Sequence, residues 1–220
     1  MRRFGTLRVP LAAVAIAVIS SSIAVGCAKP SGSIAAGPIQ QGAVVLVTHD
    51  DVAKGARETP VAAGERAYRW SRSGTLRLWV QPSCAITGWT TDHLKLVDEA
   101  VGAWTSSSVV RVAMVSWPIE ADIRLYWSDR LPPSNPGVTM LYPNQAGRLT
   151  RADVFIAVQP APWRIGTPDR VLYATIAHEL GHAFGLAHDP SPTALMHAAP
   201  LMTIVTSEDL ARLNIVVRGP

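Results

Sequence analysis

The chain has 220 residues, and 48% of them are apolar, which is enough to build a core and excludes an intrinsically disordered protein. This length fits one domain with small extensions. The formal net charge is +4, but Arg2, Arg3 and Arg8 provide three of these charges and the rest of the chain is close to neutral. A balance this close to neutral gives no electrostatic case for binding nucleic acid.

The first 26 residues have the pattern of an export signal. A short basic segment ending at Arg8 precedes an apolar run over residues 9–25, which is typical of a secretory leader. Residues 24–27 read AVGC, similar to a bacterial lipobox except that Ala24 stands where leucine is usual. We therefore expect residues 1–26 to be removed and Cys27 to carry a lipid at the outer face of the cell membrane. The alternative is ordinary signal cleavage and a soluble secreted protein.

The cysteine count leaves a second question open. The chain contains two cysteines, Cys27 and Cys84. If Cys27 carries a lipid, Cys84 stays unpaired. If it does not, an oxidising compartment allows a disulfide between them.

The composition predicts a tether followed by one folded domain. Residues 27–67 are rich in Gly, Ala and Pro, which indicates a flexible tether, and the domain is expected to cover residues 68–220. Alternating apolar residues and β-branched runs predict strands within this domain. These strands are expected at residues 75–80, 109–115, 123–127, 138–142 and 152–158.

Three helices are expected in the same domain. The first follows residues 90–91 and carries an apolar stripe along one face. The second has clear end signals, with Thr167 as the N-cap, Pro168 in the first helical position and Gly185 as the stop. The third starts at the capping sequence of residues 206–209.

The most specific pattern is the segment HELGHAFGLAH from His178 to His188. His178 and His182 are four residues apart on the second helix, so both imidazoles can reach one metal ion. Gly185 allows the chain to turn, so that His188 can return to the same ion. Glu179 stands beside the first ligand, where this motif uses it as a general base. The fourth metal position stays open for water, which distinguishes a catalytic zinc site from a closed structural one.

This segment matches the long zinc motif of the metzincin peptidases, and the chain resembles the matrixin branch most. The resemblance gives Met196, in the sequence ALM, the role of the methionine turn beneath the metal. Residues 121–125 (ADIRL) are similar to the third strand of the family. The resemblance implies an α+β fold: a mixed twisted sheet of about five strands, an active-site helix and a small C-terminal subdomain, with a cleft between the two parts.

The resemblance also implies a zinc-dependent metalloendopeptidase that hydrolyses extracytoplasmic proteins. One zinc ion per chain is expected on the three histidines of the motif, with Glu179 passing a proton from water to the leaving amine. By analogy with the family, a peptide binds extended beside the strand at residues 138–142. The residues expected to contact the substrate are Val138, Leu141, Leu201 and Met202.

Two other functions stay open. One is a non-catalytic zinc-binding surface lipoprotein, against which Glu179 argues; the other is a hydrolase of another amide or ester bond. The loop at residues 128–137 contains one acidic residue and no histidine, so no second zinc site is visible and calcium is doubtful. The expected partners are a peptide or protein substrate and the membrane through the N-terminal lipid, and the chain is expected to be a monomer.

Overall fold

The computed structural model describes residues 60–129, 131, 136–158, 167–200 and 202–219. The predicted signal peptide, Cys27 and Leu201 lie outside these residues. Within the described ranges, no helix combines the length and the apolar character that a membrane span requires.

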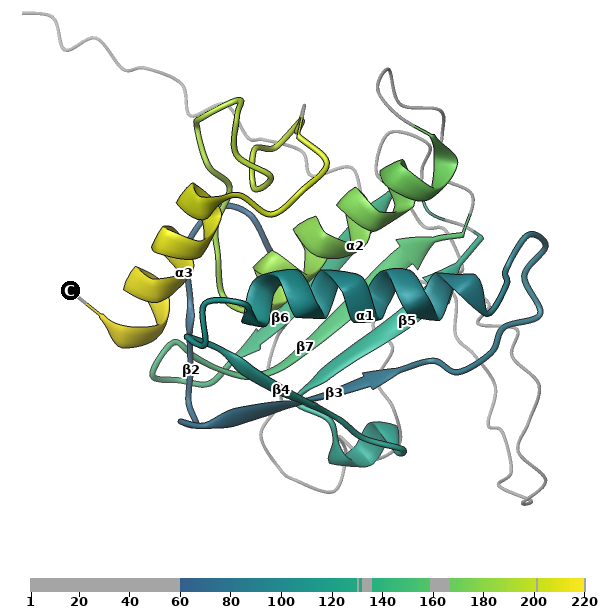
Figure 1. The fold of residues 1–220 in the computed structure, drawn as a ribbon. Helices are drawn as coiled ribbons and strands as arrows, with labels where there is room; N and C mark the ends of the chain where they lie inside the picture. The colour runs from purple at the N-terminus through teal and green to yellow at the C-terminus, as the bar shows by residue number, and fades with distance from the viewer. Residues whose placement is uncertain (1–59, 130, 132–135, 159–166, 201, 220) are drawn as a thin grey trace, which may run out of the picture.

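One mixed sheet runs through the molecule (Figure 1), in the order β1-β6-β7-β5-β3-β4, and β2 pairs with the start of β7. Strands β4, β3, β5 and β7 run parallel to one another, whereas β6 is antiparallel to β7 and β1 is antiparallel to β6. The strands are β1 (Val61–Ala62), β2 (Arg69–Trp70), β3 (Thr75–Val80), β4 (Arg111–Met114), β5 (Ile123–Ser128), β6 (Gly137–Pro143) and β7 (Arg148–Ala157).

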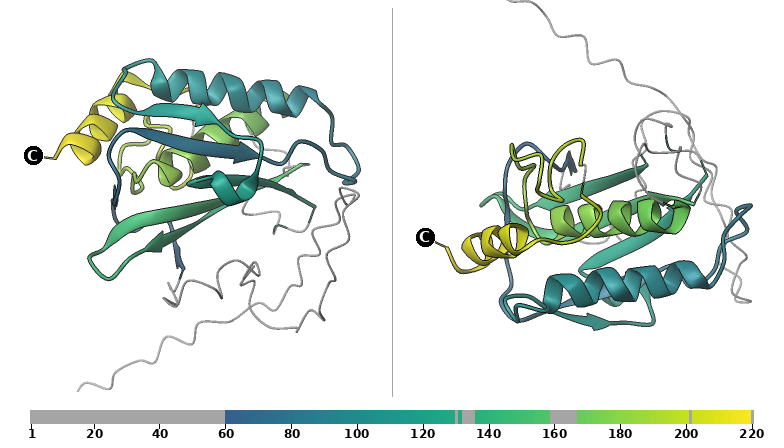
Figure 2. Two further views of the ribbon diagram at one scale, coloured as in Figure 1. Left: turned by 90° about the horizontal axis from the view of Figure 1, so that it is seen from below. Right: turned by 45° about the horizontal axis from the view of Figure 1, so that its top comes forward.

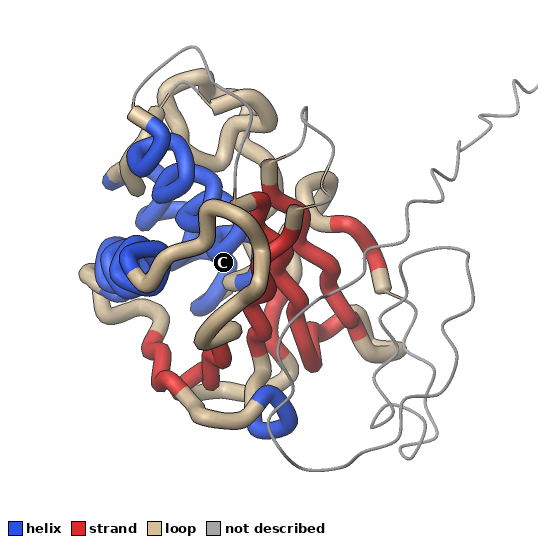
Figure 3. Tube along the Cα trace, turned by 90° about the vertical axis from the view of Figure 1, so that its right-hand side faces the viewer, coloured by secondary structure: helices blue, strands red, loops and turns tan. Residues whose placement is uncertain are grey.

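The two longer helices cover one face of this sheet, and the third lies near the carboxyl end of the second (Figures 1 and 2). Seen end-on, helices and strands form separate layers (Figure 3). A short 3-10 helix, η2 (Pro118–Glu120), precedes β5. The helices are α1 (Asp92–Thr105), α2 (Pro168–Ala183) and α3 (Ser207–Arg218).

The core lies between the sheet and the two covering helices. Leu76 and Leu78 alternate inward along β3, and Trp104 of α1 is fully buried. The indole nitrogen of Trp104 donates to the carbonyl of Ala177 at 2.8 Å, which joins α1 to α2. Nearly every residue of α2 is buried, so this helix is held on all sides rather than along one stripe.

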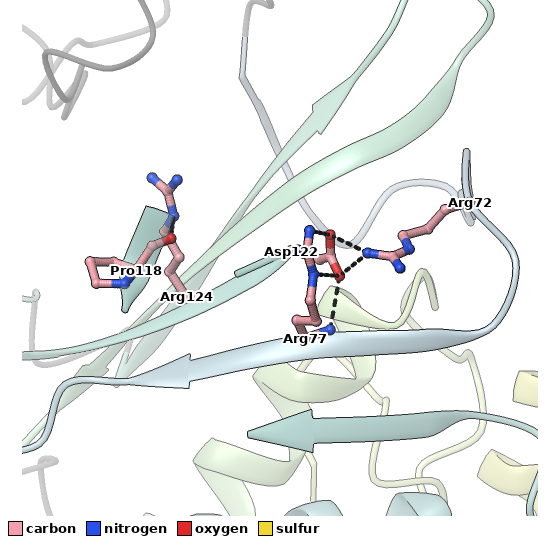
Figure 4. A network of polar contacts seen from close by, with 5 residues as sticks. All are labelled: Arg72, Arg77, Pro118, Asp122 and Arg124. Atoms are coloured by element: carbon pink, nitrogen blue, oxygen red, sulfur yellow. Dashed lines mark hydrogen bonds and ion pairs between the residues drawn. The ribbon is translucent and has the colours of Figure 1, made fainter. Parts of the chain in front are cut away.

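A polar network ties the central strands together at the start of β5 (Figure 4). The Asp122 carboxylate accepts from the Arg72 guanidinium at 2.8 Å and from both the backbone and the side chain of Arg77. Burial raises the pKa of Asp122, but the hydrogen bonds from the two arginines outweigh it and hold the pKa below its usual value. Two residues further along, in β5, the Arg124 Nε donates to the carbonyl of Pro118 at 2.9 Å. These contacts fix β3, β5 and η2 relative to one another.

The predicted α+β class with a mixed sheet is confirmed, and each predicted strand and helix has a counterpart. Two short strands, β1 and β2, were not predicted. The predicted domain start at residue 68 is too late, because Val61 and Ala62 already pair with β6 and Gly64 contacts His188. The end of the expected tether is thus part of the fold. The division into two parts with a cleft between them stays a prediction.

Candidate metal centre

The end of α2 creates the reversal on which the centre depends. The Gly185 N–H donates to the carbonyl of His182 at 2.9 Å, and the Leu186 N–H donates to the carbonyl of Gly181 at 3.0 Å, which is a Schellman-type cap. Gly185 has a φ of 107°, and a Cβ there would lie 2.0 Å from the carbonyl oxygen of Tyr68. Only glycine satisfies both conditions, so the predicted stop at this position is confirmed.

The reversal brings three histidines together. His178, His182 and His188 each offer a ring nitrogen, and these three nitrogens lie within 4.8 Å of one another. The Nε2 atoms of His182 and His188 are 3.2 Å apart. Nitrogens about 2 Å from a shared ion at near-tetrahedral angles are separated by roughly this distance. The three histidines are therefore positioned to bind one metal ion.

The backbone fixes the orientation of the two helical histidines. The Nδ1 of His178 donates to the carbonyl of Leu195, and the Nδ1 of His182 donates to the carbonyl of Leu186, each at 2.8 Å. A hydrogen bond from Nδ1 sets the tautomer and leaves the lone pair on Nε2, which then points at the metal position.

The electrostatics of the site favour neutral imidazoles. Burial lowers the pKa of His178 to about 4 and that of His182 to about 3. Burial also lowers the pKa of His188. Only neutral imidazole binds a metal ion, so at neutral pH protons do not compete for these nitrogens.

His188 is held differently, by contact with the segment before β2. Its backbone N–H donates to the carbonyl of Gly64 at 2.8 Å. Gly64 has a φ of 115°, and a Cβ on it would lie 2.5 Å from Cε1 of His188. The imidazole therefore rests directly on the backbone of Gly64, which no larger residue allows.

Met196 lies against α2 at Gly181, which directly precedes His182. Its side chain is 1% exposed. A Cβ on Gly181 would come within 2.4 Å of the Met196 sulfur and 2.8 Å of Trp104. The position agrees with the predicted methionine turn, whose role in supporting the metal stays a prediction.

Asp209 is a residue that sequence reasoning treated only as a helix cap. Its buried carboxylate closes a capping box with Thr206 at the start of α3. The same carboxylate accepts from the backbone N–H groups of Leu195 and Met196 at 3.2 and 3.3 Å. Because the carbonyl of Leu195 orients His178, Asp209 positions that histidine through the intervening turn. A capping box in the sequence cannot show this second contact, which depends on the tertiary fold.

Glu179 lies buried beside β6. Its Oε2 accepts from the hydroxyl of Thr139 at 2.6 Å. Burial raises the pKa of Glu179 to about 7, and the bond from Thr139 opposes that shift. A Cβ on Gly137 would lie 2.8 Å from Oε1, so glycine gives the carboxylate its room. Glu179 thus directly follows His178 in the chain. Its raised pKa lies close to neutral pH, where a general acid or base both accepts and releases a proton readily.

Part of the predicted substrate contact is wrong. The side chain of Leu141 is fully buried in the core, so it cannot touch a substrate. Val138 alternates with Thr139 along β6 and therefore faces away from Glu179. Met202 is partly buried and its contact with a substrate stays a prediction.

The chain is similar to part of a known protein, although it matches no family model. No protein-family model matches the chain. The chain is similar to human matrix metalloproteinase-20, with 32% identity over 108 residues, which cover 47% of this chain and 22% of that protein. The chain therefore spans about a fifth of the length of this relative. The similarity and the three-histidine group are together consistent with a metzincin-like fold, and the similarity suggests a peptidase.

Proposed function

We propose that this protein is a zinc-dependent peptidase that hydrolyses internal peptide bonds of extracytoplasmic proteins. One observation carries the proposal: three ring nitrogens are positioned to hold one metal ion, and the residue that directly follows His178 in α2, Glu179, is a buried carboxylate with no ion-pair partner among the described residues. The partial similarity to a protein named as a matrix metalloproteinase supports the same reaction class.

The donor set fits zinc. Neutral imidazole nitrogen is a good zinc ligand, and three protein ligands with one open position are typical of catalytic zinc sites. Within the described ranges, the metal-binding group consists of the three histidines alone, with no fourth His, Cys or carboxylate. The Nδ1 bonds to Leu195 and Leu186 are the outer contacts that such ligands require. We infer one zinc ion per chain, and calcium remains doubtful.

In this proposal the chemistry depends on Glu179. A zinc ion, when bound, supplies a Lewis acid that polarises a carbonyl and acidifies water. The Glu179 carboxylate accepts the proton of the attacking water and returns it to the leaving nitrogen. The hydroxyl of Thr139 holds this carboxylate in one orientation. Burying a carboxylate costs free energy that a pure metal-binding protein has no reason to spend, which favours an enzyme over a binding protein.

We also propose that the enzyme acts outside the cytoplasm as a monomer held by a lipid on Cys27. The export signal and the AVGC sequence at residues 24–27 support this location. The Cys27→Ala variant should then move from the membrane fraction to the soluble fraction. Mass spectrometry that finds an unmodified mature N-terminus would support the secreted alternative.

The metal and the reaction can be tested on the same preparation. Metal analysis should find about one zinc per chain, as expected for a single three-ligand site. The protein should cleave members of a broad peptide library, lose this activity after chelation and regain it when zinc is added. Zinc without cleavage would favour the binding protein, and cleavage only of esters or non-peptide amides would favour the other hydrolase. A protein that binds no metal would contradict the proposal.

A further inference from the structure

The edge of the sheet beside Glu179 is already occupied by the chain itself. Val61 and Ala62 of β1 lie opposite Leu141 and Met140 of β6 in an antiparallel pair. The Ala63 N–H then donates to the carbonyl of Thr139 at 3.0 Å. No described strand pairs with the same edge of β6 at Gly137 or Val138.

This segment continues directly to the metal centre. Immediately after Ala63, the carbonyl of Gly64 accepts from the His188 N–H at 2.8 Å, and the imidazole rests on the glycine. Thr139, which accepts the bond from Ala63, donates its hydroxyl to Glu179. Residues 61–64, which we call the edge segment, therefore span the distance from β6 to His188 on one side of the site.

The edge segment shows what kind of ligand this edge accepts. An extended peptide recognises an open sheet edge through its main chain, and the antiparallel arrangement is the more stable one. A peptide that continues in line with β1 therefore runs antiparallel to β6. Its amino-terminal part points toward Met140 and Leu141, where β1 lies, and its carboxyl-terminal part points past Gly137.

We propose that the edge segment fills the subsites for substrate residues on the amino side of the cleaved bond, so that the enzyme recognises peptides by the residues on the carboxyl side. This inference rests on the proposed peptidase function. With a rise of about 3.3 Å per residue, the open edge at Gly137 and Val138 admits about two residues before β1 is met. Longer amino-side extensions gain nothing unless they displace the edge segment.

A proline pair provides matched variants. Ala63→Pro removes the N–H that bonds to Thr139. In an antiparallel pair, bonded positions alternate, so the bonds at residues 63 and 61 leave the N–H of Ala62 pointing away from β6. Ala62→Pro therefore introduces the same ring one position earlier and retains the bonds to β6. Each substitution is made separately in the full-length chain. Neither residue is part of the metal centre.

The first measurement is independent of catalysis. Hydrogen exchange at the Leu141 amide, which lies opposite Val61, should be faster in Ala63→Pro than in the wild type and unchanged in Ala62→Pro. Equal exchange in all three proteins would overturn the proposed occupation of the edge.

The second measurement uses two nested sets of peptides that share one cleaved bond. Extension from two to five residues on the amino side should change kcat/KM of the wild type and Ala62→Pro less than about twofold. In Ala63→Pro the same extension should raise kcat/KM about tenfold, the value of one or two added main-chain hydrogen bonds. Extension on the carboxyl side should raise kcat/KM in all three proteins.

The outcomes separate this inference from the proposed function. An equal gain from amino-side residues in the wild type and Ala63→Pro would overturn the inference and leave the peptidase intact. If Ala63→Pro cleaves peptides and the other two proteins do not, the edge segment blocks substrate binding at this edge completely, which also supports the inference. Cleavage of no peptide by any of the three proteins would remove the proposed function and the inference together.

Discussion

The helical histidines and the loop histidine reach the same point by different means. His178 and His182 are buried in α2, and a backbone carbonyl fixes each ring. His188 is exposed, and it is held by a backbone bond and a ring contact with Gly64. Two of the histidines thus belong to the core, whereas the third depends on a segment far away in sequence.

This difference separates the residues that stabilise the domain from the residue that completes the metal centre. The helical pair is set by the same packing that stabilises the domain, so its geometry persists as long as the fold does. His188 adds little to the core, but it completes the three-histidine group. It also brings this group into contact with the edge segment. A substitution of His188 should therefore impair metal binding strongly while changing the stability of the fold little.

The largest effect that tests this comparison is loss of a ligand. His182→Ala and His188→Ala should both weaken zinc binding by more than about 100-fold, beyond what loss of an outer contact causes. Without metal the two variants should differ. His182→Ala should lose about 1–3 kcal/mol of the free energy of unfolding, because a buried ring and its bond to Leu186 are removed. His188→Ala should lose about 0.5 kcal/mol or less.

Zinc titration and denaturant unfolding of the metal-free proteins check this prediction. Equal destabilisation by the two variants would show that His188 is as much part of the core as His182, contrary to the comparison.

The turn beneath the helical pair should show an intermediate effect. Asp209→Asn weakens the bonds to Leu195, Met196 and Thr206, and should reduce the free energy of unfolding by about 2–3 kcal/mol. Zinc affinity should fall by about 10-fold, because the carbonyl that orients His178 loses its support. Glu208→Gln is the matched control, since it removes an exposed acid from the same helical turn and should cost about 0.5 kcal/mol.

Unfolding and zinc-affinity measurements on both variants are required here. If Asp209→Asn lowers stability without changing zinc affinity, the carboxylate stabilises α3 but does not position His178.

Sequence reasoning succeeded where the signal is local. The cap at Thr167 and the stop at Gly185 depend on residues close in the chain, and α2 has the predicted ends. It failed for β1, because two residues carry no periodic pattern and pair only through the tertiary fold. It also failed for Leu141, because alternation along β6 does not reveal which face meets the core. The edge segment and the second role of Asp209 are long-range contacts that no local spacing encodes.

The smallest effect is expected far from the metal centre, in the Asp122 network. Asp122→Asn should lower the free energy of unfolding by about 1–2 kcal/mol at pH 7, a value reduced because Arg72 and Arg77 are partly exposed. Because the folded-state pKa of Asp122 is lowered, the wild type keeps this contribution above pH 3.8 and loses it as the pH falls below that value. Asp98→Asn, at an exposed position of α1, is the control.

Unfolding curves at pH 7 and at about pH 3 test this sign, because protonation removes the charge that the arginines stabilise. The gap between wild type and Asp122→Asn should shrink at the lower pH, and zinc affinity at pH 7 should be unchanged. A gap that widens in acid would contradict the assignment.

The central claim is that Glu179 performs proton transfer beside a metal that it does not hold. Glu179→Gln keeps the size of the side chain and removes the group that accepts a proton. Zinc content and stability of this variant should match the wild type, while kcat/KM for peptide cleavage should fall by about 10²–10⁴-fold. The decisive measurement is zinc content and peptide cleavage on the same sample of each protein. Full zinc with cleavage reduced by that factor supports the account, whereas cleavage at the wild-type rate would contradict it.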